Sequence, residues 1–360
     1  MRSSDRAEPC SAVAALSGGV DSAVAAMIAR RRGLQVIGVT LEMPAGAPSS
    51  ARDVCRQLGI QHHVLDVRDL FDERVIGPFC AAWVEGRTPN PCVECNACLK
   101  LPELLRIADD LGCDAVVTGH YARIRRAERE YHLLRGLDRA KDQSYMLYRL
   151  EQRTLVRLLL PLGERTKAEV QRLAAEAGLR PAERPESQDI CFAPDGDVAA
   201  VLAGRRPEAV RPGPILDREG KLLGEHQGLA RYTVGQRRGL GLGGPEGPFF
   251  VLRKLPERNV LVVGPEEDVM AERCELERVH LVGTPPGEAF DASVMTRYRG
   301  RETPARVELG GDRATVLFER PHRAPAPGQS AVFYEPGGAG ERVIGGGVIL
   351  PPTSDDTPEI

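Results

Sequence analysis

The stretch Ala15-Leu16-Ser17-Gly18-Gly19-Val20-Asp21-Ser22 decides the fold of the first half of this chain. It follows a short apolar run and precedes an alanine-rich segment, a pattern that predicts a buried strand, a glycine turn and a helix. Such a turn places backbone N–H groups in front of a helix dipole, which suits phosphate oxygens. Because the stretch lacks the Gly-Lys-Ser/Thr ending of a Walker A loop, we expect it to hold the pyrophosphate of ATP while the α-phosphate is attacked.

Patterns typical of strands and helices alternate outward from this loop. The expected strands are 11–16, 34–41, 61–67 and 115–118, and the expected helices are 21–32, about 50–58, 145–150 and 166–177. This alternation predicts an α/β fold, a doubly wound parallel sheet whose ligand lies at the carboxyl ends of the strands. Gly119 and His120 follow the last of these strands, so we expect them at the same edge of the sheet.

The composition limits the classes of function open to this chain. Its 360 residues are enough for two or three domains, and its net charge of −3 gives no overall positive field that would indicate a nucleic-acid partner. No stretch has the apolar length of a membrane span, and the polar start has no signal-peptide core. We therefore expect a cytoplasmic protein with no membrane partner. In such a protein, nine unevenly spaced cysteines favour thiols that serve catalysis or metal binding over a disulfide framework.

Three cysteines, Cys92, Cys95 and Cys98, stand at two-residue gaps in a stretch with two prolines. The prolines predict a loop until a helix begins near Cys98, and thiols close to a helix N-terminus are expected to have lowered pKa values. Structural zinc is one alternative, although a second Cys/His pair is missing nearby. An iron–sulfur cluster is a stronger one, although the fourth cysteine and the proline of a ferredoxin run are missing. Cys191 lies between two apolar residues, and this window alone predicts a buried, inert thiol.

Beyond a linker rich in Arg, Pro and Gly at about 204–213, the helical pattern gives way to β-rich runs separated by Gly/Pro turns. The expected strands are 229–234, 249–254, 260–263, 292–298, 305–308, 315–318, 330–334 and 343–350. They predict a small β-rich module followed by a β-barrel or sandwich. The expected parts are a catalytic domain at 1–203, a central β-rich domain at 204–272, a C-terminal β-barrel domain at 273–351 and a disordered tail at 352–360.

Two basic segments lie in this β-rich half, Arg231–Arg238 and Arg297–Arg301. Each interleaves arginine with tyrosine, which suits a phosphate backbone with unstacked bases, although either segment alone reads more simply as a solvated arginine face. Two such segments joined to an ATP-using domain favour a polyanionic substrate.

Several motifs occur together in the order of one known family. They are the loop at 15–22, TPNPC-x-x-CN at 88–96, TGHYAR at 118–123, GLD-x-x-KDQSY at 136–145, ICF at 190–192, GEHQGL at 224–229, TVGQR-x-GLG at 233–241 and PGQSAVFY at 327–334. Over nearly its full length the chain thus resembles the bacterial tRNA-specific 2-thiouridylases, whose sheet is of the ATP pyrophosphatase (PP-loop, adenine nucleotide alpha hydrolase-like) type. Many ATP pyrophosphatases share the loop alone, whereas the combination is highly specific.

The resemblance implies a sulfurtransferase that adenylates the 2-carbonyl oxygen of the wobble uridine in tRNA and then replaces this oxygen with sulfur. By position, residues 15–22, Leu41 and Gly119 match those that bind ATP. The positions that match tRNA contacts are His120, Lys141, Asp142, Gln143, Arg297, Tyr298 and Gln329. Asp21 is expected to help hold magnesium against the phosphates, because this hard cation prefers oxygen ligands.

By the same match, Cys95 is the nucleophile and Cys191 carries a persulfide, which reverses the inference from the window around Cys191. Either the terminal persulfide sulfur attacks directly or the Cys95 thiolate releases it, and both versions could close with a Cys95–Cys191 disulfide that needs a reductant. The alternative is a 4Fe–4S cluster on Cys92, Cys95 and Cys191, with one open iron that carries the sulfur. We rank the persulfide ahead because three cysteines leave a cluster incomplete, although Cys98 could complete it.

The resemblance also implies two partners, tRNA and a sulfur donor, which is a cysteine desulfurase or a sulfur-relay protein. A more distant alternative is an ATP pyrophosphatase that forms an amide on a small metabolite, which would leave the paired cysteines and the basic segments without a function. A third is a regulatory protein that carries a metal or a cluster and whose ATP loop is vestigial.

Overall fold

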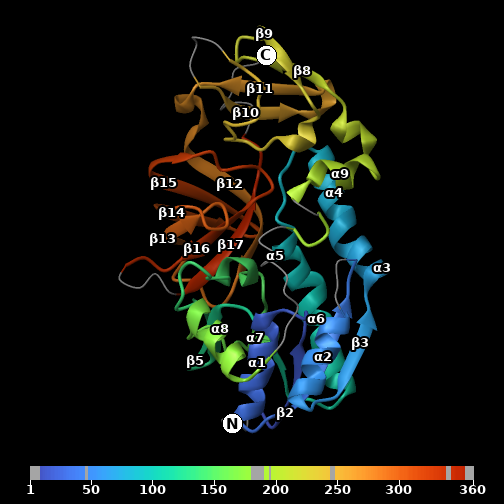
Figure 1. Ribbon diagram of the computed structural model, residues 1–360. Coiled ribbons are helices and arrows are strands. Elements are labelled where there is room, and N and C mark those ends of the chain that lie inside the picture. The colour runs from blue at the N-terminus through green and yellow to red at the C-terminus, as the bar shows by residue number, and fades with distance from the viewer. Residues whose placement is uncertain are drawn as a thin grey trace. The chain divides into compact units, whose positions relative to one another are not determined.

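The computed structural model describes residues 9–44, 48–179, 190–193, 196–243, 248–337 and 342–352. The chain divides into two compact units, whose elements are drawn in Figure 1. The first unit comprises Met1–Arg74 and Val93–Ser187, and the second comprises Val75–Cys92 and Gln188–Ile360. The predicted domain boundaries stay predictions, and residues 353–360 of the predicted tail lie outside the described residues.

A parallel five-stranded sheet forms the centre of the first unit, with the strand order β3-β2-β1-β4-β7. Its strands are β1 (Ser11–Ala15), β2 (Gln35–Glu42), β3 (His62–Asp66), β4 (Ala115–Val117) and β7 (Leu158–Leu159). The first four lie where the alternating pattern predicts them, so the parallel α/β sheet is confirmed. Because parallel strands share their carboxyl edge, the residues that follow β1, β2 and β4 lie at one edge of the sheet.

Helices cover both faces of this sheet. The helices of this part of the chain are α1 (Val20–Arg31), α2 (Pro48–Leu58), α3 (Arg68–Phe71), α6 (Leu101–Asp110), α7 (Gln152–Leu155) and α8 (Lys167–Glu176), with a π-helical turn at Asp72–Ile76, and α1, α2 and α6 contact the sheet directly. Ala12 and Ala14 share one core with α1, α2 and α8, and their small side chains let the alanine-rich α1 approach the sheet closely. α6 contacts β1 and β4 but lies outside that core, so it packs on the other face, toward which Val13 points.

Two parts of the first unit differ from the prediction. A hairpin of β5 (Ala122–Ala127) and β6 (Glu130–Arg135) follows β4, although the sequence pattern did not indicate it. The helix predicted at 145–150 is a single 3₁₀ turn, Ser144–Leu147. The helix expected after Thr166 is confirmed as α8, since Thr166 and Glu169 form both hydrogen bonds of a capping box.

The predicted cysteine loop is wrong, because Cys92 and Cys95 already lie on a helix. Helix α5 spans Pro91–Cys95 and continues through the π-helical η2 (Asn96–Lys100) into α6. Asn90 begins it, since its side-chain oxygen accepts the Cys92 N–H at 3.1 Å, and Pro91 follows as the first helical residue. An asparagine cap followed by proline starts a helix, whereas the sequence reasoning treated these residues as breakers.

The second unit contains a small four-stranded sheet with the order β10-β11-β8-β9, which confirms the predicted β-rich module. The strands of this sheet are β8 (Gly213–Leu216), β9 (Leu222–His226), β10 (Phe250–Leu255) and β11 (Val260–Gly264). The second unit also contains the helices α4 (Gly77–Val84) and α9 (Val198–Ala203) and 3₁₀ turns at Pro207–Val210, Leu229–Arg231, Pro256–Arg258 and Glu266–Val269. The strand predicted at 229–234 is therefore wrong. Its apolar residues Leu229 and Tyr232 instead cover the sheet from a turn.

A closed barrel with the order β12-β15-β14-β13-β16-β17 completes the second unit, so the barrel alternative is confirmed over the sandwich. Its strands are β12 (Met270–Leu281), β13 (Ala289–Met295), β14 (Thr303–Gly310), β15 (Arg313–Arg323), β16 (Ser330–Tyr334) and β17 (Val343–Ile349). Alternating side chains, such as Phe290, Ala292 and Val294 of β13, fill the interior.

Candidate nucleotide site and cysteine helix

The predicted phosphate-binding loop follows the carboxyl end of β1 and runs directly into α1. Gly18 has a φ of +83°, a conformation that favours glycine, and Gly19 is the N-cap of α1. The Ser22 hydroxyl accepts the Ser17 N–H at 3.2 Å and donates to the Gly19 carbonyl at 3.0 Å. The two serines thus bond the loop to itself. Because Gly19 has no side chain to cap α1, the N–H groups in the first turn of α1 remain suited to an anion.

Asp21 is held by two side chains from distant parts of the first unit. The Lys167 ammonium lies 2.8 Å from each carboxylate oxygen of Asp21, and the Tyr121 hydroxyl donates to Oδ1 at 2.8 Å. The Lys167 side chain is 13% exposed, against 32% for Asp21. A lysine therefore stands beside the phosphate-binding loop, brought there by the first residue of α8 instead of by a Walker A sequence.

The GLDRAKDQSY loop fixes both partners of Asp21. The Asp138 carboxylate accepts the Lys167 backbone N–H at 2.9 Å. The Gln143 side-chain oxygen accepts the Tyr121 N–H at 2.9 Å, and the Gln143 N–H donates to the Tyr121 carbonyl at 2.8 Å. The loop that was expected to touch tRNA is therefore also part of the frame that positions the phosphate-binding loop.

Asp142 lies buried at the base of the same loop. Its carboxylate accepts hydrogen bonds from the Gly136 N–H at 2.9 Å and from the Ser144 hydroxyl at 2.9 Å, and Arg135 lies 3.3 Å away. These contacts shape the loop, on which Lys141 is partly exposed. Contact of Lys141, Asp142 and Gln143 with tRNA stays a prediction.

Leu41 and Gly119 lie at the carboxyl edge beside the phosphate-binding loop. Leu41 is buried near the end of β2, next to Thr40, whose hydroxyl donates to the Leu16 carbonyl at 2.9 Å. A Cβ on Gly119 would stand 2.8 Å from the backbone carbon of Asp21, so only glycine fits where the chain leaves β4. The structure brings both residues to the loop, and their contact with ATP stays a prediction.

His120 follows Gly119 and is partly exposed. Its Nδ1 lies 2.8 Å from the Thr118 hydroxyl. Burial, with a smaller contribution from the Lys100 ammonium, lowers the pKa of the His120 imidazole. A neutral imidazole at this edge can accept and donate hydrogen bonds, and contact with tRNA stays a prediction.

Cys95 is buried on the cysteine helix, and burial raises the pKa of its thiol despite the nearby Lys100 ammonium. Burial likewise raises the pKa of the Cys98 thiol, to which the Glu94 carboxylate adds. The predicted lowering of these pKa values is wrong, because desolvation of the thiolate outweighs the dipole of a five-residue helix.

Cys191 is exposed, so the buried thiol inferred from its sequence window is wrong. The following Phe192 packs edge-on against Phe79 of α4, with ring centroids 5.1 Å apart. Phe192 is thus packed against α4, whereas the neighbouring Cys191 thiol stays exposed to solvent. All nine cysteines of the chain are thiols rather than disulfides.

The barrel carries the remaining residues predicted to touch tRNA. Arg297 is exposed in the turn after β13, and Arg299 lies over the Tyr298 ring at 5.2 Å. Gln329 lies just before β16, and its Nε2 donates to the Thr88 carbonyl at 2.6 Å. The turn therefore presents charge and an aromatic ring to solvent, whereas the Gln329 amide already has a partner within the second unit.

Neither metal predicted for this chain is built in by protein ligands alone. Among the described residues, no three His, Cys, Asp or Glu side chains form a group that could hold a metal ion. Asp21 fits magnesium only together with phosphate oxygens and water, which is how this ion usually binds at nucleotide sites. Cys92 and Cys95, one turn apart on α5, are chemically suited to iron, but they supply only two ligands of a cluster.

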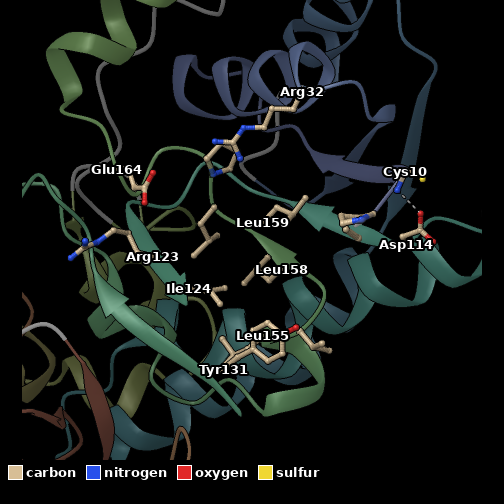
Figure 2. Close-up of a pocket in the computed structure, with 15 residues that line it drawn as sticks. Cys10, Arg32, Asp114, Arg123, Ile124, Tyr131, Leu155, Leu158, Leu159 and Glu164 are labelled. Atoms are coloured by element: carbon tan, nitrogen blue, oxygen red, sulfur yellow. Dashed lines mark hydrogen bonds between the residues drawn. The ribbon is translucent and has the colours of Figure 1, made fainter. Parts of the chain in front are cut away.

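A pocket of about 510 Å³ lies elsewhere in the first unit (Figure 2). Cys10 and Asp114, which precede β1 and β4, stand at one side of it, and Leu155, Leu158 and Leu159 give it an apolar wall. It therefore lies toward the amino ends of the strands, away from the phosphate-binding loop, and we do not assign it to ATP.

The sequence did not indicate that Lys167, Tyr121 and Asp138 join the candidate nucleotide site. Tyr121 and Asp138 belong to motifs that the resemblance rests on, so their identity was a usable signal. Lys167 follows a helix cap and carries no local sign of its role, because its contact with Asp21 joins residues 146 positions apart.

Family models match three consecutive parts of the chain. The models are described as the tRNA methyl transferase HUP domain at residues 11–195, the tRNA methyl transferase PRC-barrel domain at 200–265 and the aminomethyltransferase beta-barrel domain at 271–349. Within the ranges that the structure describes, no helix combines the length and apolar character needed to cross a membrane.

Two curated relatives match nearly the whole chain, and both are named tRNA-specific 2-thiouridylase MnmA. The protein of Chloroflexus aggregans is 48% identical over 94% of this chain and 98% of its own length. That of Desulforudis audaxviator is 46% identical over 93% of this chain and 97% of its own. A solved 4-thiouridine synthetase–RNA complex with ATP is 23% identical over 47% of this chain and 41% of its own, with a TM-score of 0.34.

Proposed function

Because the chain belongs to the family of tRNA-specific 2-thiouridylases, we propose that it catalyses the ATP-dependent 2-thiolation of the wobble uridine of tRNA. The observation that carries the proposal is the full-length match to these relatives, joined to a phosphate-binding loop at the carboxyl edge of a parallel sheet. The names of two family models suggest methyl transfer instead. That reaction accounts for fewer features of this chain, because an ATP-binding loop and two cysteines have no evident use in it.

In the first half of the reaction, the 2-carbonyl oxygen of the uridine attacks the α-phosphorus of ATP and pyrophosphate leaves. The N–H groups at the start of α1 hold phosphate oxygens, and the Lys167 ammonium compensates the charge that develops on them. Magnesium bound between Asp21 and the phosphates would neutralise further charge. The carbonyl oxygen thereby becomes part of AMP, a good leaving group.

In the second half, sulfur replaces AMP at C2 of the uridine. Cys191 receives a sulfur atom from a cysteine desulfurase or a sulfur-relay protein and holds it as a persulfide. The terminal sulfur forms the new bond to carbon as the bond to AMP breaks, and the Cys95 thiolate takes the remaining Cys191 sulfur in a disulfide that a reductant reopens. The exposure of Cys191 supports this assignment, since a large donor protein must reach the thiol.

The alternative is the same thiolation with a 4Fe–4S cluster held by Cys92, Cys95 and Cys191. Anaerobic purification followed by iron and sulfide analysis separates the two mechanisms. About four irons per chain would favour the cluster. Full thiolation activity by iron-free protein would favour the persulfide.

The proposed function is tested by pyrophosphate release with and without unmodified tRNA. We expect release to depend on tRNA, and retention of tRNA to weaken steeply with added salt because phosphate contacts release counterions. An amide-forming ligase would release pyrophosphate with a small acceptor and without tRNA. A protein with a vestigial ATP loop would release none.

A further inference from the structure

The segment that leads into the cysteine helix is held by side chains and backbone of the second unit. It spans Gly86–Pro89, directly before Asn90, which begins α5. The Thr88 N–H donates to the Pro327 carbonyl at 2.7 Å, and the Gln329 Nε2 donates to the Thr88 carbonyl at 2.6 Å. Both polar groups of the Thr88 backbone are therefore bonded to the stretch between β15 and β16 of the barrel.

Gly328 makes this close approach possible. Its φ is +88°, and a Cβ at this position would stand 2.8 Å from the Thr88 nitrogen and from the Arg87 Cβ. The backbone around Gln329 is itself fixed, since the Gln329 carbonyl accepts the Ile349 N–H at 2.8 Å. The Gln329 amide is thus presented to Thr88 from a rigid support.

Lys254 of β10 holds the same segment from the central sheet. Its ammonium lies 3.3 Å from the Thr88 hydroxyl, 3.4 Å from the Arg87 carbonyl and 4.3 Å from the centre of the Trp83 ring. Burial lowers the pKa of Lys254 to about 7. In addition, Arg87 pairs with Glu277 of β12 at 2.7 Å.

We propose that Gln329 is a positioning residue for the cysteine helix, which it holds through the Thr88 carbonyl. Thr88 lies four residues before Cys92 and seven before Cys95, so movement of its backbone shifts the start of the helix that carries both thiols. One amide N–H of Gln329 is already committed to this bond at 2.6 Å. The proposal deepens the proposed function and rests on it for the role of Cys95.

The test compares Gln329→Met, which keeps the length of the side chain but cannot donate, with Gln35→Met at an exposed position of β2. We call the hydrogen bond from the Gln329 amide to the Thr88 carbonyl the clamp. Hydrogen exchange, followed by mass spectrometry on peptides that cover 86–95, reports on the clamp without any need for activity. We expect faster exchange there in Gln329→Met and unchanged exchange in β16 and β17. The thiolation kcat at saturating tRNA should fall about three- to tenfold, as expected for the loss of one hydrogen bond.

Each other outcome overturns the proposal. A higher tRNA Kd with unchanged kcat would make Gln329 a tRNA contact, and unchanged exchange at 86–95 would mean that its amide does not hold the segment. Faster exchange with unchanged kcat would make the clamp irrelevant to the thiols. If the unaltered protein forms no 2-thiouridine, the proposed function fails, whereas the exchange data still decide whether the clamp exists.

Discussion

At Asp21, a carboxylate in the phosphate-binding loop meets a lysine from another helix. The Lys167 ammonium bonds both oxygens of Asp21, and the Asp138 carboxylate fixes the backbone from which this lysine extends. Because the Lys167 ammonium lies this close to the loop, it can exchange its bonds to the Asp21 carboxylate for bonds to phosphate oxygens when ATP binds. The pair thus keeps the Lys167 ammonium oriented beside the phosphate-binding loop before ATP binds.

Lys167→Met is predicted to lower tRNA-dependent pyrophosphate release about 10²-fold or more, because the charge that faces the phosphates is lost. Pyrophosphate release at saturating ATP and tRNA is the measurement. Lys221→Met, at an exposed turn between β8 and β9, is the matched control and should leave the rate unchanged. An unchanged rate in Lys167→Met would show that the lysine only supports the fold.

Cys95→Ser and Cys191→Ser are each predicted to abolish formation of 2-thiouridine, because a hydroxyl can neither carry a persulfide nor form the closing disulfide. Nucleoside analysis of the tRNA after incubation with ATP and a sulfur donor is the measurement. The tRNA Kd should stay unchanged in both variants, and Cys10→Ser, an exposed thiol, is the control. Loss of tRNA binding would instead assign a structural role to the two thiols.

The local geometry of the candidate nucleotide site could be predicted from the sequence, and the part built by tertiary contacts could not. Gly18 and Asp21 stand in one short stretch whose strand–turn–helix pattern is readable by itself. Lys167 and Tyr121 reach the stretch only because α8 and the end of β4 pack beside it. The thiol pKa of Cys95 was predicted in the wrong direction for a similar reason, since its burial depends on the whole unit.

At the scale of elements, the end of β4 and the phosphate-binding loop approach so closely that only glycine fits between them. Gly119→Ala would place a methyl group 2.8 Å from the backbone of Asp21, so the loop must shift. We expect the KM for ATP to rise about tenfold or more, because a small displacement at a phosphate site is costly. Steady-state kinetics at saturating tRNA is the measurement.

Gly204→Ala is the matched control for this variant, since Gly204 has ordinary φ and a Cβ there meets no atom within 4 Å. Its KM should equal that of the unaltered protein. An unchanged KM in Gly119→Ala would mean that the loop can move aside without effect on ATP.

Elements with a continuous apolar run were predicted, whereas elements rich in charged residues were missed. The buried β1 and the barrel strand β16 have continuous apolar runs that only a strand or buried helix can carry. β12 has the sequence MAERCELERVHL, and of its twelve residues just Cys274 and Leu276 are buried. Its many charged residues therefore hid the apolar alternation by which a strand is recognised. The hairpin of β5 and β6 was missed likewise, because Arg125 and Arg126 of β5 are exposed and interrupt its apolar pattern.

At the scale of the whole molecule, buried neutral histidines couple stability to pH. His226 is fully buried, with its Nε2 3.0 Å from the Asn259 carbonyl and its Nδ1 accepting the Gly228 N–H at 3.0 Å. Burial lowers the pKa of His226 and of His322 below the ordinary value of 6.5. As pH falls through this value, the unfolded chain takes up protons that the folded chain does not, so stability is present above it and is lost below it.

The midpoint temperature of thermal unfolding is therefore predicted to decrease when the pH is lowered from 7.5 to 5.5. This pH range lies above the ordinary titration of carboxylates. His226→Gln removes one of the protons that the unfolded chain gains and should make the pH dependence shallower. His63→Gln, at an exposed position of β3, is the control. A midpoint that rises toward pH 5.5 would contradict the sign of these shifts.

The order of the main parts was predictable, whereas their grouping was not. An α/β pattern followed by evenly spaced β-rich runs predicts a parallel sheet and then a barrel, and both are present. The segment Val75–Cys92 lies within the α/β half of the sequence but belongs to the second unit. Its bonds to Lys254, Glu277 and Gln329 decide this, and no local pattern shows such contacts.

We propose that this protein consumes one ATP for each sulfur atom that it transfers to tRNA. The most direct test counts AMP and 2-thiouridine in the same reaction, with unmodified tRNA, ATP and a persulfide donor. We expect equal amounts of both products and none of either without tRNA. AMP without 2-thiouridine, or a uridine that gains a methyl group instead of exchanging oxygen for sulfur, would contradict it.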